Sequence, residues 1–286
     1  MSAKRILFAT DFDEAARHAR AEVAAVAVAF GAQVHVVNVL PSPLRAFVSS
    51  TRDEDEATTT LSEWTRELQS AGAEASAAPI ARGNAAEAIV ELAERLEVQL
   101  IMVGASNKST LERLVTGSTA EAIARSAHQP VWISRPPHAG IKRVVVGVDG
   151  SDASRVAVED ALAITQRAGA SLDVVAALDK LELNPLGMTA KEEDAARERF
   201  RESQEHDIRA FLAASRSDGS DVAHFAWGEA HDVLATFVHD NDADVLVVGR
   251  SGSGGVRRVL LGTTAERLLR TCPCSLVLTG SPTSQP

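Results

Sequence analysis

Glycine and threonine residues late in the chain have the spacing of an anion-binding loop. Gly249 and Gly252 follow directly on an apolar run, and Gly262 comes further along with Thr263 and Thr264 behind it. Glycines have no Cβ, so they let the main chain approach an anion closely. Amide and hydroxyl donors at a helix start add to this, because the helix dipole favours negative charge there. This pattern predicts a site that holds phosphate groups.

Charged side chains stand close to this loop in the predicted sheet. Asp149 ends an earlier apolar run and opens the segment Asp149-Gly-Ser-Asp, which is also favourable turn chemistry. Two interpretations stay open: Asp149 caps a turn, or it faces a ligand. Asp11 has the equivalent place in the first half of the chain, and this position at a strand end favours the ligand. Arg250 adds a cation that could steer phosphate or form a partner surface.

The elements that must position these residues are repeated along the chain. The apolar run ending at Asp11 matches the run ending at Asp149 at an offset of 138 residues, and from Gly83 onward the offset is 145. The step of seven residues indicates an insertion between the second and third strands. Residues 135–140, rich in proline and glycine, form the expected linker. We therefore expect two domains, over residues 1–135 and 141–281.

Short apolar runs alternate with longer amphipathic segments in each half, which is typical of βαβ units. Strands that are apolar throughout indicate a parallel sheet with helices on both faces. Pro79 places the third strand of the first half at a sheet edge, because proline cannot donate to a central ladder. The predicted fold class is α/β: two tandem doubly wound, Rossmann-like domains, each a five-stranded parallel sheet covered by helices on both faces.

The element boundaries can be predicted as well. The run 34–40 is the expected second strand of the first half. In the second half the expected strands are residues 143–148, 171–177, 221–226, 244–248 and 275–278, and the expected helices are residues 154–168, 191–214, 231–240 and 263–271. The helix 191–214 is expected to bury Phe200, Ile208, Phe211 and Leu212.

The composition narrows the class of protein. The chain has 286 residues, of which 45% are hydrophobic and 24% charged, as in ordinary soluble proteins. A formal net charge of −10 repels a phosphate backbone, so we expect no nucleic-acid partner. No apolar stretch reaches the roughly 20 residues of a membrane span. Cys272 and Cys274 are too few and too close together to staple the fold, and we expect a cytoplasmic protein without membrane contact.

The glycine spacing resembles a known family. Gly249-x2-Gly252-x9-Gly262-Thr263 is similar to the nucleotide-binding pattern of the universal stress protein family, G-x2-G-x9-G-[S/T]. Both halves resemble such domains from the first strand to the last, which implies a tandem member with an adenine nucleotide alpha hydrolase-like fold. The resemblance further implies a stress-response protein that binds ATP in its second half, with Mg²⁺ on the phosphates, and acts as a nucleotide-dependent sensor or regulator.

The resemblance assigns roles to residues of the second half. Asp149 would lie near the ribose or hold the metal, and the backbone around Ala177 would meet the adenine. Val248 and Gly249 would flank the ribose. The residues expected to bind the nucleotide are Gly147, Val148, Asp149, Ala177, Val248, Gly249, Gly252, Ser253, Gly262, Thr263 and Thr264.

The first half departs from this pattern at one position. It has Asn107 where the family has its second glycine, although Asp11 is retained and Lys108 could reach a phosphate. Asparagine tolerates a positive φ angle, but its side chain occupies space near the expected phosphate path. We expect the first site to be weaker than the second, or empty.

Two other functions stay open. One is an enzyme with slow ATP hydrolysis or self-phosphorylation on Ser251, Ser253 or Thr263. The other is an interaction protein that uses the scaffold without nucleotide. The chain contains no G-x4-G-K-[S/T], G-x-G-x-x-G after a first strand, or G-x-S-x-G motif, and phosphoryl transfer needs more positioned groups than Asp149 and Arg250. By family resemblance, the last strands of the halves, 131–133 and 276–278, should pair within the molecule, and a further homodimer is plausible.

Overall fold

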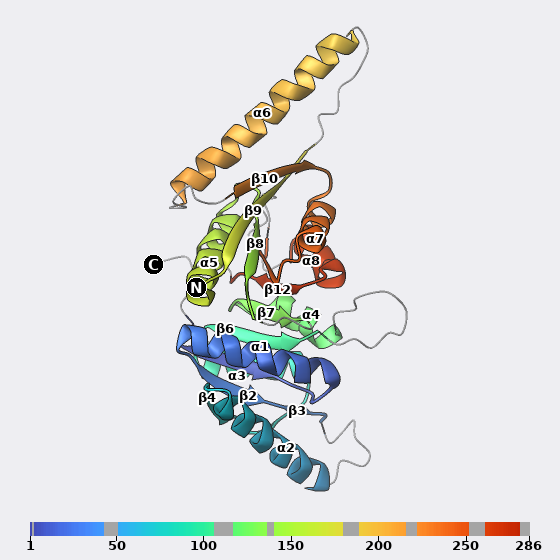
Figure 1. Ribbon diagram of the computed structural model, residues 1–286. Helices are drawn as coiled ribbons and strands as arrows, with labels where there is room; N and C mark the ends of the chain where they lie inside the picture. Colours follow the sequence, from blue (N-terminus) through green and yellow to red (C-terminus); the bar gives the residue numbers. More distant parts are fainter. Residues whose placement is uncertain are drawn as a thin grey trace.

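The structure is a computed structural model of the chain. It describes residues 1, 3–42, 51–105, 117–135, 140–179, 189–215, 222–251 and 261–280, without the side chains of residues 51–53 and 222. The predicted α/β class is confirmed, because strands and helices alternate along the chain and the strands form a large, mostly parallel sheet (Figure 1).

The first half contains two kinds of strand: those of the large sheet and two short ones that pair with each other. The strands are β1 (Arg5–Ala9), β2 (Gln33–Val37), β3 (Val39–Leu40), β4 (Glu74–Ala77), β5 (Ala81–Arg82), β6 (Leu100–Gly104) and β7 (Val131–Ser134). The helices are α1 (Glu14–Phe30), α2 (Thr51–Ser70), α3 (Ala85–Arg95) and α4 (Ser118–Ser126).

The second half repeats this order without the short pair among its described residues. Its strands are β8 (Arg143–Gly147), β9 (Ser171–Leu178), β10 (Val222–Trp227), β11 (Val245–Val248) and β12 (Ser275–Leu278). Its helices are α5 (Asp152–Ala168), α6 (Ala190–Ala214), α7 (Ala230–Asp240) and α8 (Thr263–Thr271). The predicted strands and helices of this half differ from these bounds by two residues at most.

The strands of the two halves form one ten-stranded sheet in the order β10-β9-β8-β11-β12-β7-β6-β1-β2-β4. Within each half all pairings in this sheet are parallel. Strands β12 and β7 join the halves and run antiparallel, with Val277 opposite Trp132. The predicted pairing of the last strands is therefore confirmed. Strand β4 is at one edge of the sheet, as Pro79 predicts, and it ends before that proline.

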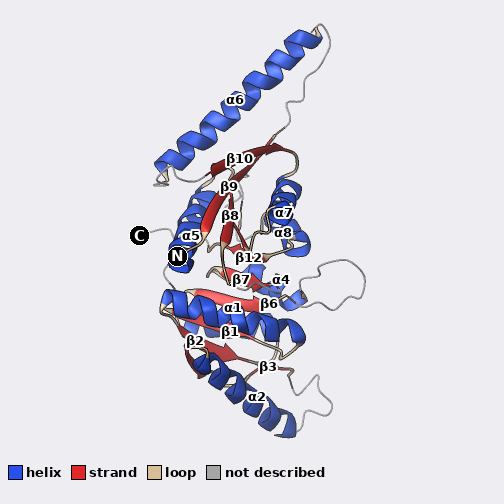
Figure 2. Ribbon diagram, in the orientation of Figure 1, coloured by secondary structure: helices blue, strands red, loops and turns tan. Residues whose placement is uncertain are grey.

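Two apolar cores lie on the two faces of this sheet, and each runs through both halves. One face is covered by α1, α2 and α5, and the other by α4, α7 and α8 (Figure 2). Helix α3 lies on the same face as α4, because its apolar residues belong to the same core. Each of the eight strands between the edge strands β4 and β10 thus contributes side chains to both cores. This explains why the strands are apolar throughout instead of alternating.

Helix α6 differs from its counterpart α2. In α2, Leu61, Trp64 and Leu68 are buried against the sheet. Of the four residues expected to be buried in α6, only Leu212 is buried, and Phe200, Ile208 and Phe211 are half-buried. Figure 1 shows α6 set apart from the other helices at one end of the molecule. The predicted buried side is confirmed for Leu212, with Ile208 and Phe211 packed against the same core, while Phe200 is half-buried.

The run 34–40 is not the single strand that its apolar residues predict. Asn38 interrupts it, because the side-chain amide donates to the carbonyl of Thr10 at 2.8 Å. Beyond Asn38 the chain leaves the large sheet, and β3 pairs with β5. This turn brings Val39 beside the end of β1, where it lines a cavity.

The joint between the halves contains a buried carboxylate and an ionic network. Glu22 of α1 accepts hydrogen bonds from Trp132 Nε1 at 3.0 Å, from Ser275 Oγ at 2.9 Å and from Ser134 Oγ. These donors come from β7 and β12, so Glu22 ties both halves together. On the other face the arginine and glutamate pairs of α4 and α8 interact across the joint, within 2.8–3.5 Å: Arg125, Glu121, Arg270 and Glu266.

Candidate functional site

A cavity of about 130 Å³ lies at the carboxyl ends of β8 and β11 in the second half. These two strands are neighbours at the centre of this half-sheet, and β9 and β12 flank them. The helices that follow β8 and β11 cover opposite faces. This is the switch point of a doubly wound sheet, where ligands usually bind.

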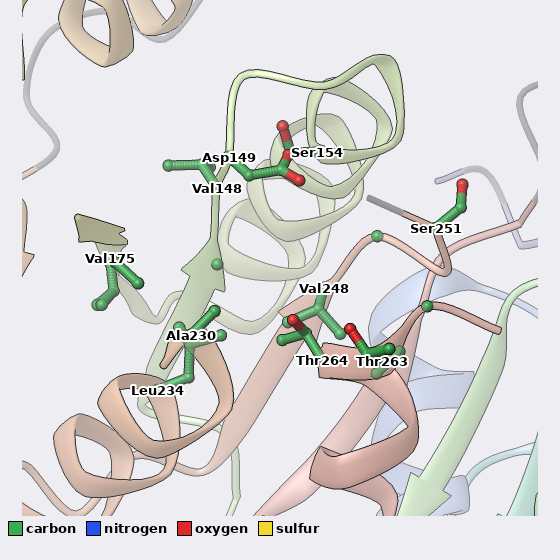
Figure 3. Close-up of a pocket in the computed structure, with 15 residues that line it drawn as sticks. Val148, Asp149, Ser154, Val175, Ala230, Leu234, Val248, Ser251, Thr263 and Thr264 are labelled. Atoms are coloured by element: carbon green, nitrogen blue, oxygen red, sulfur yellow. The ribbon is translucent and has the colours of Figure 1, made fainter. Parts of the chain in front are cut away.

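Nine of the eleven predicted site residues line this cavity. They are Gly147, Val148, Asp149, Ala177, Val248, Gly249, Gly262, Thr263 and Thr264. The remaining two, Gly252 and Ser253, lie outside the described residues. Figure 3 shows the hydroxyl groups of Thr263 and Thr264 at the start of α8, across the cavity from Asp149 and Ser154.

The start of α8 is open toward the cavity. Its N-cap is Gly262, which has no side chain to bond the first amides, whereas α5 is capped by Ser151. The position of Gly262 is held by its amide, which donates to the carbonyl of Arg250 at 2.8 Å. A helix start without a side-chain cap leaves N–H groups for another acceptor. Together with the threonine hydroxyls, these groups suit an anion.

Asp149 makes the turn contact that its sequence context predicts and also lies on the wall of the cavity. Its Oδ1 accepts the amide of Ser151 at 3.0 Å, which is the turn chemistry expected of Asp-Gly-Ser-Asp. The residue also lines the cavity. The turn contact and a place on the cavity wall therefore occur together in this residue.

Close packing explains why residue 249 is a glycine, and the sequence does not reveal this. A Cβ at this position would lie 2.9 Å from Ala153 Cβ and 3.0 Å from the main-chain carbon of Ala153. Its counterpart Gly104 is equally tight, 2.9 Å from the amide nitrogen of Ala16. The glycine therefore permits close packing of α5, or of α1, on the strand end. Approach of an anion is not its primary explanation.

The interpretation of Arg250 as a residue that steers phosphate is wrong. Its side chain is buried, and its Nη2 donates to the carbonyl of Gln129 in the first half at 2.7 Å. Burial lowers the pKa of this guanidinium to about 10. Arg250 therefore points into the joint between the halves and does not line the cavity.

Several cavity residues are missed by motif reasoning. Ser154, Val175, Ala230, Leu234 and Ala265 also line the space. Most of these are apolar residues on helix or strand faces, where their types only indicate core. The internal repeat is the one available signal, because their counterparts line the corresponding cavity of the first half: Ala16, Val37, Ala85, Ile89 and Ala120.

This corresponding cavity lies at the carboxyl ends of β1 and β6 and has about 300 Å³. Asp11, Gly104, Gly117, Ser118 and Thr119 line it at the positions equivalent to Asp149 and the glycine–threonine residues of the second half. Asn107 and Lys108, on which the expectation of a weaker first site rests, lie outside the described residues. The first half thus has the larger of these two cavities.

No helix among the described residues is long and apolar enough to cross a membrane.

Comparison with known proteins identifies both halves. The model of the universal stress protein family matches residues 2–135 and 140–280. A universal stress protein from Mycolicibacterium smegmatis is 28% identical over 182 residues, which is 59% of this chain and 58% of that protein. The chain thus spans little more than half the length of this curated relative.

Solved structures show the same fold. A universal stress protein from Archaeoglobus fulgidus superposes with a TM-score of 0.75 at 19% identity, over 98% of this chain and 99% of that chain. A second structure from Archaeoglobus fulgidus, a universal stress protein in complex with dAMP, has a TM-score of 0.38 at 26% identity, over 46% of this chain and 97% of that chain. The first of these supports the architecture of the whole chain.

Proposed function

Since this chain belongs to the universal stress protein family, we propose that its second half binds ATP with Mg²⁺ and that the protein acts in stress response as a nucleotide-dependent sensor or regulator. The observation that carries this proposal is the cavity at the switch point of the second half, with the open start of α8 on one side. Its residue pattern, Gly249 to Thr263, is the one expected of a nucleotide site in this family.

The cavity offers suitable surroundings for each part of the nucleotide. Val175 and Ala177 at the end of β9 would contact the base. Asp149 would accept hydrogen bonds from the ribose or bind the metal, and the first turn of α8 would bind the phosphates. Mg²⁺ is commonly held by one or two carboxylates together with the phosphates of its ligand, and Asp149 supplies one such group.

The lining favours binding over turnover. Asp149 is the single ionisable side chain among the described residues that line this cavity. Phosphoryl transfer requires cations and a group that orients the nucleophile. Slow hydrolysis or self-phosphorylation on Ser251 or Thr263 is the second candidate, because both residues reach the cavity.

Isothermal titration with ATP and Mg²⁺ tests the proposal. Ala177→Phe places a ring where the base would lie, and we expect it to remove the heat of ATP binding. Val39→Phe is the matched control, since Val39 has the equivalent place in the first half. Equal heats from wild type and Ala177→Phe would exclude the second-half site.

We also propose the domain limits 1–135 and 141–281, a location in the cytoplasm, and the possibility of a homodimer of these paired domains. Size-exclusion chromatography with light scattering measures the last of these directly. A mass of about twice 30.2 kDa would support the homodimer, and a mass of 30.2 kDa would oppose it.

A further inference from the structure

The cavity of the first half differs from that of the second in size and charge. It has about 300 Å³ against about 130 Å³. In the second half Leu234 packs on the end of β8, with its Cδ1 2.9 Å from where a Cβ on Gly147 would be. In the first half the equivalent position is Ala9, which carries that methyl group, and Ile89 stands in place of Leu234.

The interior of the first cavity is apolar. Aliphatic side chains from three strands and two helices line it, and most of them are buried: Val37, Val39, Ile89, Val103 and Ile123. A surface of this kind suits a flat or apolar group of a ligand, because contact removes apolar area from water on both sides.

The rim of the first cavity carries two carboxylates. Asp11 and Asp13 both line it, and the amide of Asp13 donates to Asp11 Oδ1 at 3.3 Å. Burial raises the pKa of Asp11, and the charge of Asp13 raises it further. The equivalent residues of the second half are Asp149 and Ser151, so among the described residues the rim of the first cavity has one carboxylate more.

Helix capping does not require this extra charge. Asp13 Oδ1 caps α1 by accepting the amide of Ala16 at 2.8 Å. Ser151 Oγ caps α5 in the same way, accepting the amide of Ser154 at 3.1 Å. Because a hydroxyl caps the equivalent helix in the second half, capping alone does not explain why residue 13 is an aspartate.

We propose that the first cavity binds an uncharged ligand of nucleoside type and discriminates against its phosphorylated forms. The apolar interior would take the base, and hydroxyl groups of the sugar would donate to Asp11 and Asp13, since carboxylates are strong acceptors. A phosphate group would be repelled by the additional charge. The comparison with ATP binding in the second half rests on the proposed function, whereas nucleoside binding in the first half does not.

Coulomb repulsion sets the size of the effect. One unit charge acting on the net charge of magnesium-bound ATP across about 9 Å of high-dielectric surroundings changes the affinity about fivefold. A charge swap between Asp13 and Ser151 isolates this contribution, because both residue types cap a helix.

Isothermal titration of full-length Ala177→Phe, whose second cavity is blocked, tests the proposal with adenosine, AMP and magnesium-bound ATP as probes. We expect adenosine to bind at least fivefold more tightly than ATP, and the addition of Val39→Phe to this variant to abolish adenosine binding. Adding Asp13→Ser should raise the ATP affinity of Ala177→Phe about fivefold, and adding Ser151→Asp should lower that of Val39→Phe by a similar factor. Thermal unfolding confirms that each variant is folded.

ATP that binds to Ala177→Phe as tightly as adenosine, or adenosine binding that survives the addition of Val39→Phe to Ala177→Phe, would overturn the proposal. Failure of the proposed function looks different: wild type and Ala177→Phe would then give the same response to ATP, while adenosine binding would still depend on Val39.

Discussion

Glu22 makes the stability of the joint depend on pH. Burial raises the pKa of this carboxyl from its ordinary value of 4.5 to about 7, and the hydrogen bonds from Ser134, Ser275 and Trp132 oppose the rise. A raised pKa means that the folded protein binds a proton more tightly than the unfolded chain does. The unfolding free energy therefore falls as the pH rises from about 4.5 to about 7.

The difference between the two pKa values gives the size of this loss. At about 1.4 kcal/mol for each pH unit, ionisation of Glu22 in the folded state costs about 3 kcal/mol. Glu22→Gln keeps the shape and an acceptor oxygen but does not ionise. We expect this variant to be about as stable as wild type at pH 4.5 and up to about 3 kcal/mol more stable at pH 8.

Urea unfolding followed by tryptophan fluorescence measures this, because Trp132 itself donates to Glu22. Unfolding free energies of both proteins between pH 4.5 and 8 give a difference curve in which the other carboxyl groups cancel. A difference that does not change with pH would refute the reasoning, and would mean that Glu22 titrates normally or is ionised throughout.

Three further predictions concern packing and surface charge. Gly249→Ala should destabilise the protein by about 1–3 kcal/mol, because its methyl group would overlap Ala153, and an unchanged urea midpoint would contradict this. Trp64→Ala should cost about 3–5 kcal/mol in the same assay, since that ring is buried, and a loss below about 1 kcal/mol would show that the region relaxes around the gap. Arg125→Gln should cost less than about 1 kcal/mol at low salt and almost nothing at high salt. The hydrogen bond from Arg125 is the main cause that lowers the pKa of Glu121. The stability that Arg125 contributes should therefore also fade as the pH falls below the ordinary glutamate value of 4.5. A loss of stability in Arg125→Gln that persists in acid would contradict the ion pair.

The architecture could be predicted from the sequence because it follows from patterns that many residues share. The repeat offsets and the apolar runs identify five sheet strands in each half, and the expected meeting of 131–133 with 276–278 is observed. The site positions follow in the same way. They lie where strands end, and a doubly wound sheet collects strand ends at one edge.

Details that depend on single contacts could not be predicted. Arg250 follows a glycine in the expected phosphate loop, but only the fold reveals that the carbonyl of Gln129 lies within its reach. Asn38 looks like one polar residue in an apolar run, yet its hydrogen bond to Thr10 ends the strand. Gly249 is needed for the neighbouring helix α5, which no spacing rule records.

The antiparallel joint between β7 and β12 has a consequence for how the two halves can diverge. Trp132 and Val277, which are equivalent in the repeat, lie opposite each other at its centre. In an assembly of two identical subunits the same residue would face itself there, as two indoles or two small aliphatic groups. Covalent tethering lifts that restriction, so a bulky side chain can be fitted against a small one. It also keeps the two halves at a high effective concentration at any dilution. Each half can therefore acquire substitutions that would weaken the association of separate subunits.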